Sequence, residues 1–135
     1  MKKTIYTGNS KLSNVKYYSD TKIWNFQFDD IIFLSSSAFW RYFKGEKLSL
    51  ISKDNDLKYS FEKPKINLEN DLLNELKNEL LLSIKLNKNN DLILNFDNKK
   101  IIFYVSSTVF ENWEITIKGK QYICLNDGEI AIFNN

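Results

Sequence analysis

Alternating apolar and polar residues dominate this chain and predict a protein built mainly of β-strands. The last third of the chain shows the pattern most clearly, because Trp113, Ile115 and Ile117 alternate with polar residues as in a half-buried strand. A turn around Gly119 and a short polar loop that ends at Gly128 separate this strand from two further β-prone runs. The sequence therefore predicts a three-stranded meander here.

The same alternation recurs in the first third of the chain. Trp24, Phe26 and Phe28 alternate with Asn25 and Gln27, which predicts a strand with one aromatic face and one polar face. Further strands are expected at 31–34, 38–43, 47–51, 57–61, 84–87, 92–96 and 100–105.

One segment has a different period and predicts a helix. Its apolar stripe repeats every four residues and consists of Leu68, Leu72, Leu76 and Leu80, widened by Leu73 and Leu81. Asn67 is suited to the N-cap, and we expect the helix to cover 68–83. Its outer face is acidic and carries Glu69, Asp71, Glu75 and Glu79.

These elements predict an α+β fold in a single domain that covers residues 1–135. We expect about 9–11 short strands in a mostly antiparallel sheet that is strongly curled or forms a partial barrel, with the helix over an open face or end. The polar residues 1–10 are expected to be frayed or to form a short edge strand.

Composition narrows the chemistry that the chain can perform. There is no histidine, and the four glycines are isolated, which excludes histidine-based catalysis and a glycine-rich phosphate loop. The single cysteine, Cys124, is interpreted as a small core residue, and we expect no metal and no cofactor. No apolar run reaches the roughly 18 residues that a membrane span needs, so we expect a cytoplasmic protein.

Charge and aromatic residues together raise the question of nucleic-acid binding. Residues 1–65 carry twelve basic and seven acidic side chains, whereas 66–135 carry seven basic and ten acidic ones. Cations and rings are interleaved around Tyr17 and around Arg41, as in surfaces that stack single strands. The alternating positions of the rings are explained by a core, however, so we expect no direct contact with nucleic acid.

Carboxylates are the remaining candidates for catalysis. Asp29 and Asp30 are adjacent, but neighbours on an extended backbone point to opposite faces, so a turn explains them better. A hydrolase that uses carboxylates alone is therefore only a third hypothesis, and the protein is expected not to be an enzyme.

Arg41 is the only arginine in the chain and lies between two aromatic residues. A planar guanidinium can stack on rings and bind a carboxylate with two hydrogen bonds. The candidate partners are Glu111 and Glu114, which flank Trp113, and an ordinary surface arginine is the alternative. If the pair is buried, Arg41→Ala should destabilise the fold by roughly 3 kcal/mol or more.

Several short motifs are similar to those of a small bacterial domain family. They are F-E-N-W-E-I at 110–115, I-C-L at 123–125, G-E-I-A-I-F at 128–133, F-W-R at 39–41 and D-L-I-L-N-F-D-N at 91–98. The family pattern has tyrosine where this chain has Phe110, and glycine where it has Asp127. Most of the matching positions are of core and turn type, including Trp113 and Gly128.

This family resembles the immunity proteins of contact-dependent growth inhibition and polymorphic toxin systems. The resemblance implies a cytoplasmic protein that binds the C-terminal domain of a cognate toxin, often a basic nuclease, and neutralises it without catalysis. An acidic surface would suit such a partner because complementary charge accelerates encounter and selects the partner. The candidate docking residues are Glu69, Asp71, Glu75, Glu79, Asp54 and Asp56.

The alternative from another class is a regulatory β-barrel that binds a small apolar ligand. Its aromatic interior would consist of Trp24, Phe26, Phe28, Trp40, Phe103 and Trp113.

Overall fold

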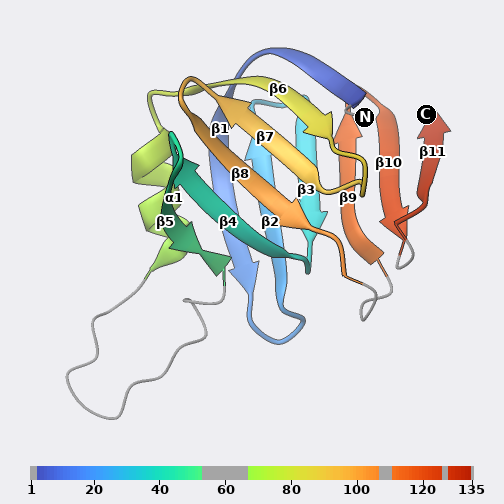
Figure 1. Ribbon diagram of the computed structural model, residues 1–135, viewed down its shortest axis with the longest axis horizontal. Coiled ribbons are helices and arrows are strands. Elements are labelled where there is room, and N and C mark those ends of the chain that lie inside the picture. The colour runs from blue at the N-terminus through green and yellow to red at the C-terminus, as the bar shows by residue number, and fades with distance from the viewer. Residues whose placement is uncertain (1–2, 53–66, 107–110, 126–127, 135) are drawn as a thin grey trace.

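A computed structural model describes residues 3–52, 67–106, 111–125 and 128–134 of the chain. These residues form eleven strands and one helix (Figure 1). The elements in chain order are β1 (Lys3–Tyr18), β2 (Ile23–Phe28), β3 (Ile32–Ser36), β4 (Phe39–Lys44), β5 (Lys47–Ile51), α1 (Leu68–Leu76), β6 (Leu80–Leu86), β7 (Leu92–Phe96), β8 (Lys99–Tyr104), β9 (Glu111–Ile117), β10 (Lys120–Leu125) and β11 (Ile130–Asn134).

All eleven strands belong to one antiparallel sheet, in the order β11, β10, β9, β3, β2, β1, β6, β7, β8, β4, β5. The antiparallel pairing is as expected, but the α+β class is wrong, because 66% of the residues are in strands and only 9% are helical. The expected strongly curled sheet or partial barrel is also wrong. The end strands β11 and β5 do not pair with each other, so the sheet stays open.

The long strand β1 connects two halves of this sheet. Its first half pairs with β6 from Lys3 to Lys11, and its second half pairs with β2 from Leu12 to Tyr18. The register shifts in both pairings, and such irregularities bend a strand. The expectation that residues 1–10 are frayed or form an edge strand is therefore wrong for the described residues 3–10, since β1 lies in the middle of the sheet.

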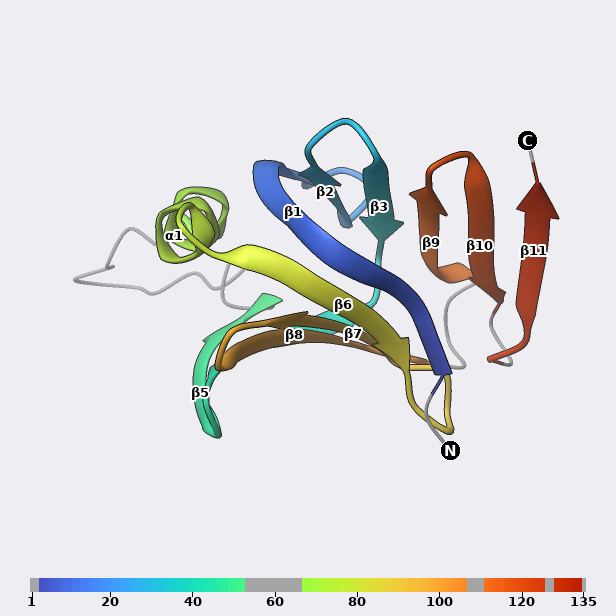
Figure 2. The ribbon, with the colours of Figure 1, turned by 90° about the horizontal axis from the view of Figure 1, so that it is seen from above.

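The two halves face each other as two layers (Figure 2). We call the part with β2, β3, β9, β10 and β11 the first layer, and the part with β4, β5, β6, β7 and β8 the second layer. Trp24 contacts Trp40 with ring centroids 5.1 Å apart, and Phe26 contacts Phe103 at 5.4 Å, both edge to face. The core therefore lies between the layers.

The helix begins where the sequence predicts and ends earlier. The side chain of Asn67 accepts a hydrogen bond from the backbone N–H of Asn70 at 3.1 Å, as an N-cap does. The expected end at 83 is wrong because α1 ends at Leu76 and residues 80–86 form β6, which pairs with β1 and β7. Within the described residues, no helix has the length and hydropathy needed to cross a lipid bilayer.

The predicted meander of the last third is confirmed. β9 pairs with β10, and β10 pairs with β11. Gly128 has φ +85°, which favours glycine, and its N–H donates to the carbonyl of Leu125 at 2.9 Å. The strand expected at 57–61 lies outside the described residues.

Candidate functional site

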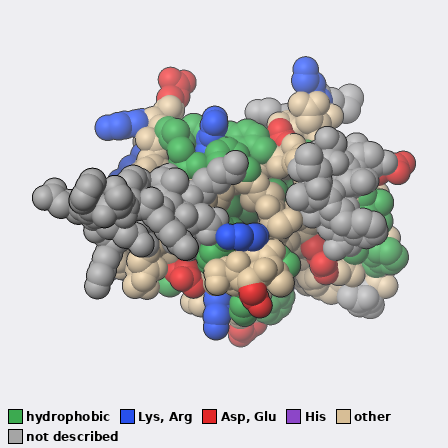
Figure 3. Space-filling view, turned by 90° about the horizontal axis from the view of Figure 1, so that it is seen from below, with side chains coloured by type: hydrophobic (Ala, Val, Ile, Leu, Met, Phe, Trp, Pro, Cys, Tyr) green, Lys and Arg blue, Asp and Glu red, His purple; other side chains and the backbone are tan. Residues whose placement is uncertain are grey.

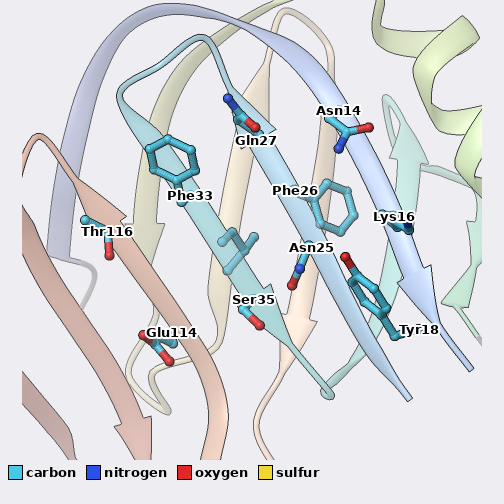
Figure 4. Close-up of a pocket in the computed structure, with 11 residues that line it drawn as sticks. Asn14, Lys16, Tyr18, Asn25, Phe26, Gln27, Phe33, Ser35, Glu114 and Thr116 are labelled. Carbon is cyan, nitrogen blue, oxygen red and sulfur yellow. The ribbon is translucent and has the colours of Figure 1, made fainter. Parts of the chain in front are cut away.

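The outward-facing side chains of four neighbouring strands surround a groove on the first layer. Period-2 alternation places the apolar residues of these strands in the core and leaves the intervening positions outside. The groove has a volume of about 380 Å³ (Figure 4). Its outward-facing lining residues come from β1, β2, β3 and β9 and are Asn14, Lys16, Tyr18, Asn25, Gln27, Phe33, Ser35, Glu114 and Thr116. We call this site the outer groove.

The strand register arranges these side chains in rows across the layer. One row runs through Lys16, Asn25, Ser35 and Glu114, which are successive cross-strand partners. Because neighbouring strands lie about 4.8 Å apart, the two charged residues at the ends of this row are roughly 14 Å apart along the sheet. The floor between them carries only small, uncharged polar side chains.

A second row crosses the groove next to the first one. It runs through Asn14, Gln27, Phe33 and Thr116. Phe33 is exposed over 47% of its surface, and Tyr18, on the β1 side of the groove, is exposed over 40%. Two rings therefore lie open to solvent beside the polar side chains of the groove.

The polar groups of the outer groove differ in how far the protein itself engages them. Oδ1 of Asn25 is buried and has no hydrogen-bond partner in the described part of the chain. Nζ of Lys16 lies over the ring of Tyr18 at 5.3 Å, and Glu114 accepts a hydrogen bond from Nε2 of Gln121. This oxygen has almost no accessible surface, so a donor from a partner reaches it only after the Asn25 side chain moves, and such a bond would offset the cost of the unpaired oxygen.

The lining of the outer groove carries groups that can bind a partner. The lining has one cation, one anion, amides, hydroxyls and rings, and these groups do not form a nucleophile with an adjacent base. Among the described residues, no group of three or more His, Cys, Asp or Glu side chains is arranged to hold a metal ion.

The acidic face of α1 is largely engaged within the protein. Glu75 forms an ion pair with Lys44, and Glu79 forms one with Lys99 at 3.7 Å. Glu69 accepts a hydrogen bond from the backbone N–H of Tyr17 at 3.1 Å. Glu79 lies after the end of α1, and of these four carboxylates predicted to contact a toxin only Asp71 is exposed. The other two candidates, Asp54 and Asp56, lie outside the described residues.

These carboxylates also affect a buried tyrosine of β4. Tyr42 is fully buried, and burial raises its pKa to about 12, with further contributions from the negative charges of Glu75 and Glu79. The amino group of Lys99 also donates to the backbone carbonyl of Glu75 at 3.4 Å, near the end of α1. The acidic face therefore holds the helix against β4 and β8.

Arg41 does not form the expected buried ion pair with Glu114. It is exposed on β4, where its guanidinium lies 5.2 Å from the ring of Phe39 and 5.5 Å from the ring of Tyr104. Glu114 lies in the first layer and hydrogen-bonds Gln121 instead. The side chain of Glu111 lies outside what the structure describes. The large loss of stability predicted for Arg41→Ala required a buried ion pair. Because Arg41 is exposed, that loss is not expected.

Trp113 and Gly128 take part in hydrogen bonds with the loop before β7. Nε1 of the buried Trp113 donates to the backbone carbonyl of Asn90 at 3.0 Å, and Nδ2 of Asn90 donates to the carbonyl of Gly128 at 2.7 Å. The neighbouring Asn112 is fully buried and donates to the carbonyl of Leu125 at 2.9 Å. These bonds join the loop before β7 to the hairpin of β10 and β11. Cys124 is buried, as expected.

The aromatic interior suggested for a small ligand is the packed core. All six of its rings are buried, and those of β2 contact rings of β4, β7 and β8. The outer groove was not predicted. The polar positions Asn25 and Gln27 were recognised as a polar face, but no local signal shows that β9 follows β3 in the sheet.

Comparison with known proteins does not assign this chain to a family. No protein-family model, no curated protein and no solved structure matches it. The resemblance to immunity proteins therefore stays a prediction. The fold and the site define a nearly all-β protein with an open groove on its first layer.

Proposed function

We propose that this protein is an immunity protein that binds a bacterial toxin domain and neutralises it without catalysis, and that the outer groove and the rings beside it form the docking surface. The observation that supports this surface best is the exposure of Phe33 and Tyr18 beside the polar side chains of the groove. Aromatic residues are enriched in protein interfaces, and central, partly enclosed rings supply much of the binding energy.

The charges around the groove suit recognition of a specific partner. Lys16 and Glu114 lie at opposite ends of one row, with uncharged side chains between them. A partner with the reverse order of charges fits this row, and one with the same order is repelled, which gives selectivity. On the face shown in Figure 3, basic and acidic side chains are interspersed and do not gather in one large patch.

The acidic helix becomes the secondary candidate for toxin binding. Glu75 and Glu79 would have to leave Lys44 and Lys99 before they could contact a partner. Asp71 is the described carboxylate that remains accessible. The proposal includes a cytoplasmic location, where a cognate toxin would be met before it acts.

A small-ligand-binding module is the second candidate function. The volume of the outer groove, about 380 Å³, lies within the range of small-molecule sites, and the unpaired Oδ1 of Asn25 would orient a donor. This candidate predicts a polar ligand on the surface, not an apolar ligand within a barrel. A ligand that stays bound through purification and is lost with Asn25→Ala would favour it.

The function is tested by producing the protein in cells together with the toxin domain encoded by the neighbouring gene. The expected result is that the unaltered protein preserves growth and Phe33→Asp does not, because the substitution places a charge at the centre of the interface. Leu48→Asp is the matched control, since Leu48 is 42% exposed on β5 of the second layer, and it should still protect.

Each outcome of this test has a separate meaning. Failure of the unaltered protein to bind or protect against the toxin would refute the immunity function. Full protection by Phe33→Asp would agree with the immunity function but would refute the outer groove as the docking surface. Circular dichroism and thermal unfolding of both variants establish that any loss of protection is not a loss of fold.

A further inference from the structure

One edge of the sheet is a regular strand without the usual protection against pairing. β11 (Ile130–Asn134) pairs with β10 over five residues without a register shift, and its other side has no partner strand among the described residues. Its sequence, IAIFN, contains no charge and no proline. Natural edge strands usually carry a lysine, a proline or a bulge, because an unprotected edge binds another strand.

The opposite edge of the sheet shows the protection that β11 lacks. β5 begins with Lys47, and its pairing with β4 shifts register between Tyr42 and Phe43. A charge and an irregular backbone both oppose the addition of a further strand.

The direction of the free hydrogen-bonding groups of β11 follows from its pairing with β10. The N–H of Leu125 donates to the carbonyl of Glu129 at 2.8 Å, so residues 129, 131 and 133 direct their backbone groups toward β10. In an antiparallel ladder, the alternate residues direct theirs the other way. Ile130, Ile132 and Asn134 therefore present N–H and C=O groups at the free edge.

The side chain of Ile132 is also not packed against the second layer. It lies opposite Tyr122, whose side chain is buried, so it points to the inner face of the first layer. Nevertheless it is 44% exposed, because β11 stands beyond the strands of the second layer (Figure 2). On the other face, Phe133 is 50% exposed.

We propose that β11 pairs antiparallel with β11 of a second copy of this chain, about a twofold axis at Ile132. Ile132 then opposes Ile132 of the copy, and Ile130 opposes Asn134, so that the free groups of both edges form about six hydrogen bonds. Ala131 opposes Phe133, which places a small side chain against a large one twice. The two Ile132 side chains cover each other on the inner face.

The β11 strand of a second copy fits this edge in size and charge. The pairing about Ile132 is self-complementary in size on the outer face, and it joins uncharged strands that do not repel each other. The twofold axis is perpendicular to the sheet, so both outer grooves lie on the same side of the dimer. This inference does not depend on the proposed function.

The oligomeric state is measured by sedimentation equilibrium over a series of protein concentrations. The unaltered protein is expected to give a dimer, and Ile132→Lys is expected to raise the dimer dissociation constant at least tenfold, because it adds like charges at the axis. Leu48→Lys on β5, at a residue of similar exposure, is the control and should leave the dimer unchanged. A monomer at every concentration would overturn the proposal, as would equal effects of the two lysines.

Cysteine cross-linking tests the register. Opposed residues of an antiparallel pair have Cβ atoms roughly 5 Å apart, so Ile132→Cys should form a disulfide-linked dimer in oxidised glutathione. Phe133→Cys should cross-link far less, because Phe133 opposes Ala131 in this register. The reverse order of cross-linking would refute the pairing about Ile132.

Discussion

The acidic face of α1 and the outer groove both present polar side chains outside the core, but most carboxylates of the acidic face are engaged within the protein. Glu75 of α1 and Glu79, which follows the helix, pair with lysines of β4 and β8. In the groove, Asn25 keeps an unpaired oxygen, and Phe33 is nearly half exposed. The comparison teaches that a run of like charges in a sequence does not identify a free surface.

The difference follows from how each element is held. A nine-residue helix is too short to be stable alone, so α1 depends on tertiary contacts with both its leucines and its carboxylates. The strands of the groove are held by backbone ladders on both sides and by their inward-facing side chains. These strands therefore do not depend on their outward-facing side chains to stay in place.

The largest expected effect is a loss of stability that distinguishes α1 from the outer groove. Leu72 of α1 is fully buried, so Leu72→Ala should lower the free energy of unfolding by about 3 kcal/mol. Phe33→Ala in the groove should change it by less than about 0.5 kcal/mol, because the ring is exposed. Urea unfolding of both variants measures the difference, and equal losses would show that Phe33 belongs to the scaffold.

The next effect concerns alkaline pH and the tyrosine beneath α1. The pKa of Tyr42 is raised from 10 to about 12 in the folded protein, so the stability linked to its protonated form is complete below pH 10 and is lost as the pH rises toward 12. The expected loss is about 2 kcal/mol. Unfolding of the unaltered protein and of Tyr42→Phe should diverge over this pH range, and parallel pH profiles would contradict the shift.

A smaller effect is expected for the ion pair of α1 with β4. Glu75→Gln removes the charge that pairs with Lys44, and the two side chains are 32% and 48% exposed, so the loss should be about 0.5 kcal/mol and should shrink at high salt. Asp71→Asn is the control on the same helix and should show little salt dependence. A larger loss with Asp71→Asn would reverse the assignment of which carboxylate holds the helix.

The elements that were predicted correctly are those whose signals come from residues close together in the sequence. The alternation around Trp24 and Trp113 and the N-cap at Asn67 are local signals, and all three are present in the structure. The end of α1 was missed because Leu80 continues the four-residue spacing by coincidence. Pairing with β1 and β7 holds Leu80 and the residues after it in a strand.

The candidate site depends on contacts between distant parts of the chain. The groove joins residues of β1 to Glu114 and Thr116 of β9, and only the order of strands in the sheet places them together. The central position of β1 was missed for the same reason, because its polar first half has a weak alternation and is held by β6. A single sequence carries no local signal for either pairing.

Isothermal titration of the toxin domain into two variants tests the central claim most directly. The account predicts that Phe33→Ala weakens binding at least about tenfold, or 1.4 kcal/mol, and that Asp71→Lys changes it by less than about twofold. Unchanged affinity with Phe33→Ala, together with a large loss of affinity with Asp71→Lys, would contradict the claim. It would show that the toxin docks on the helix.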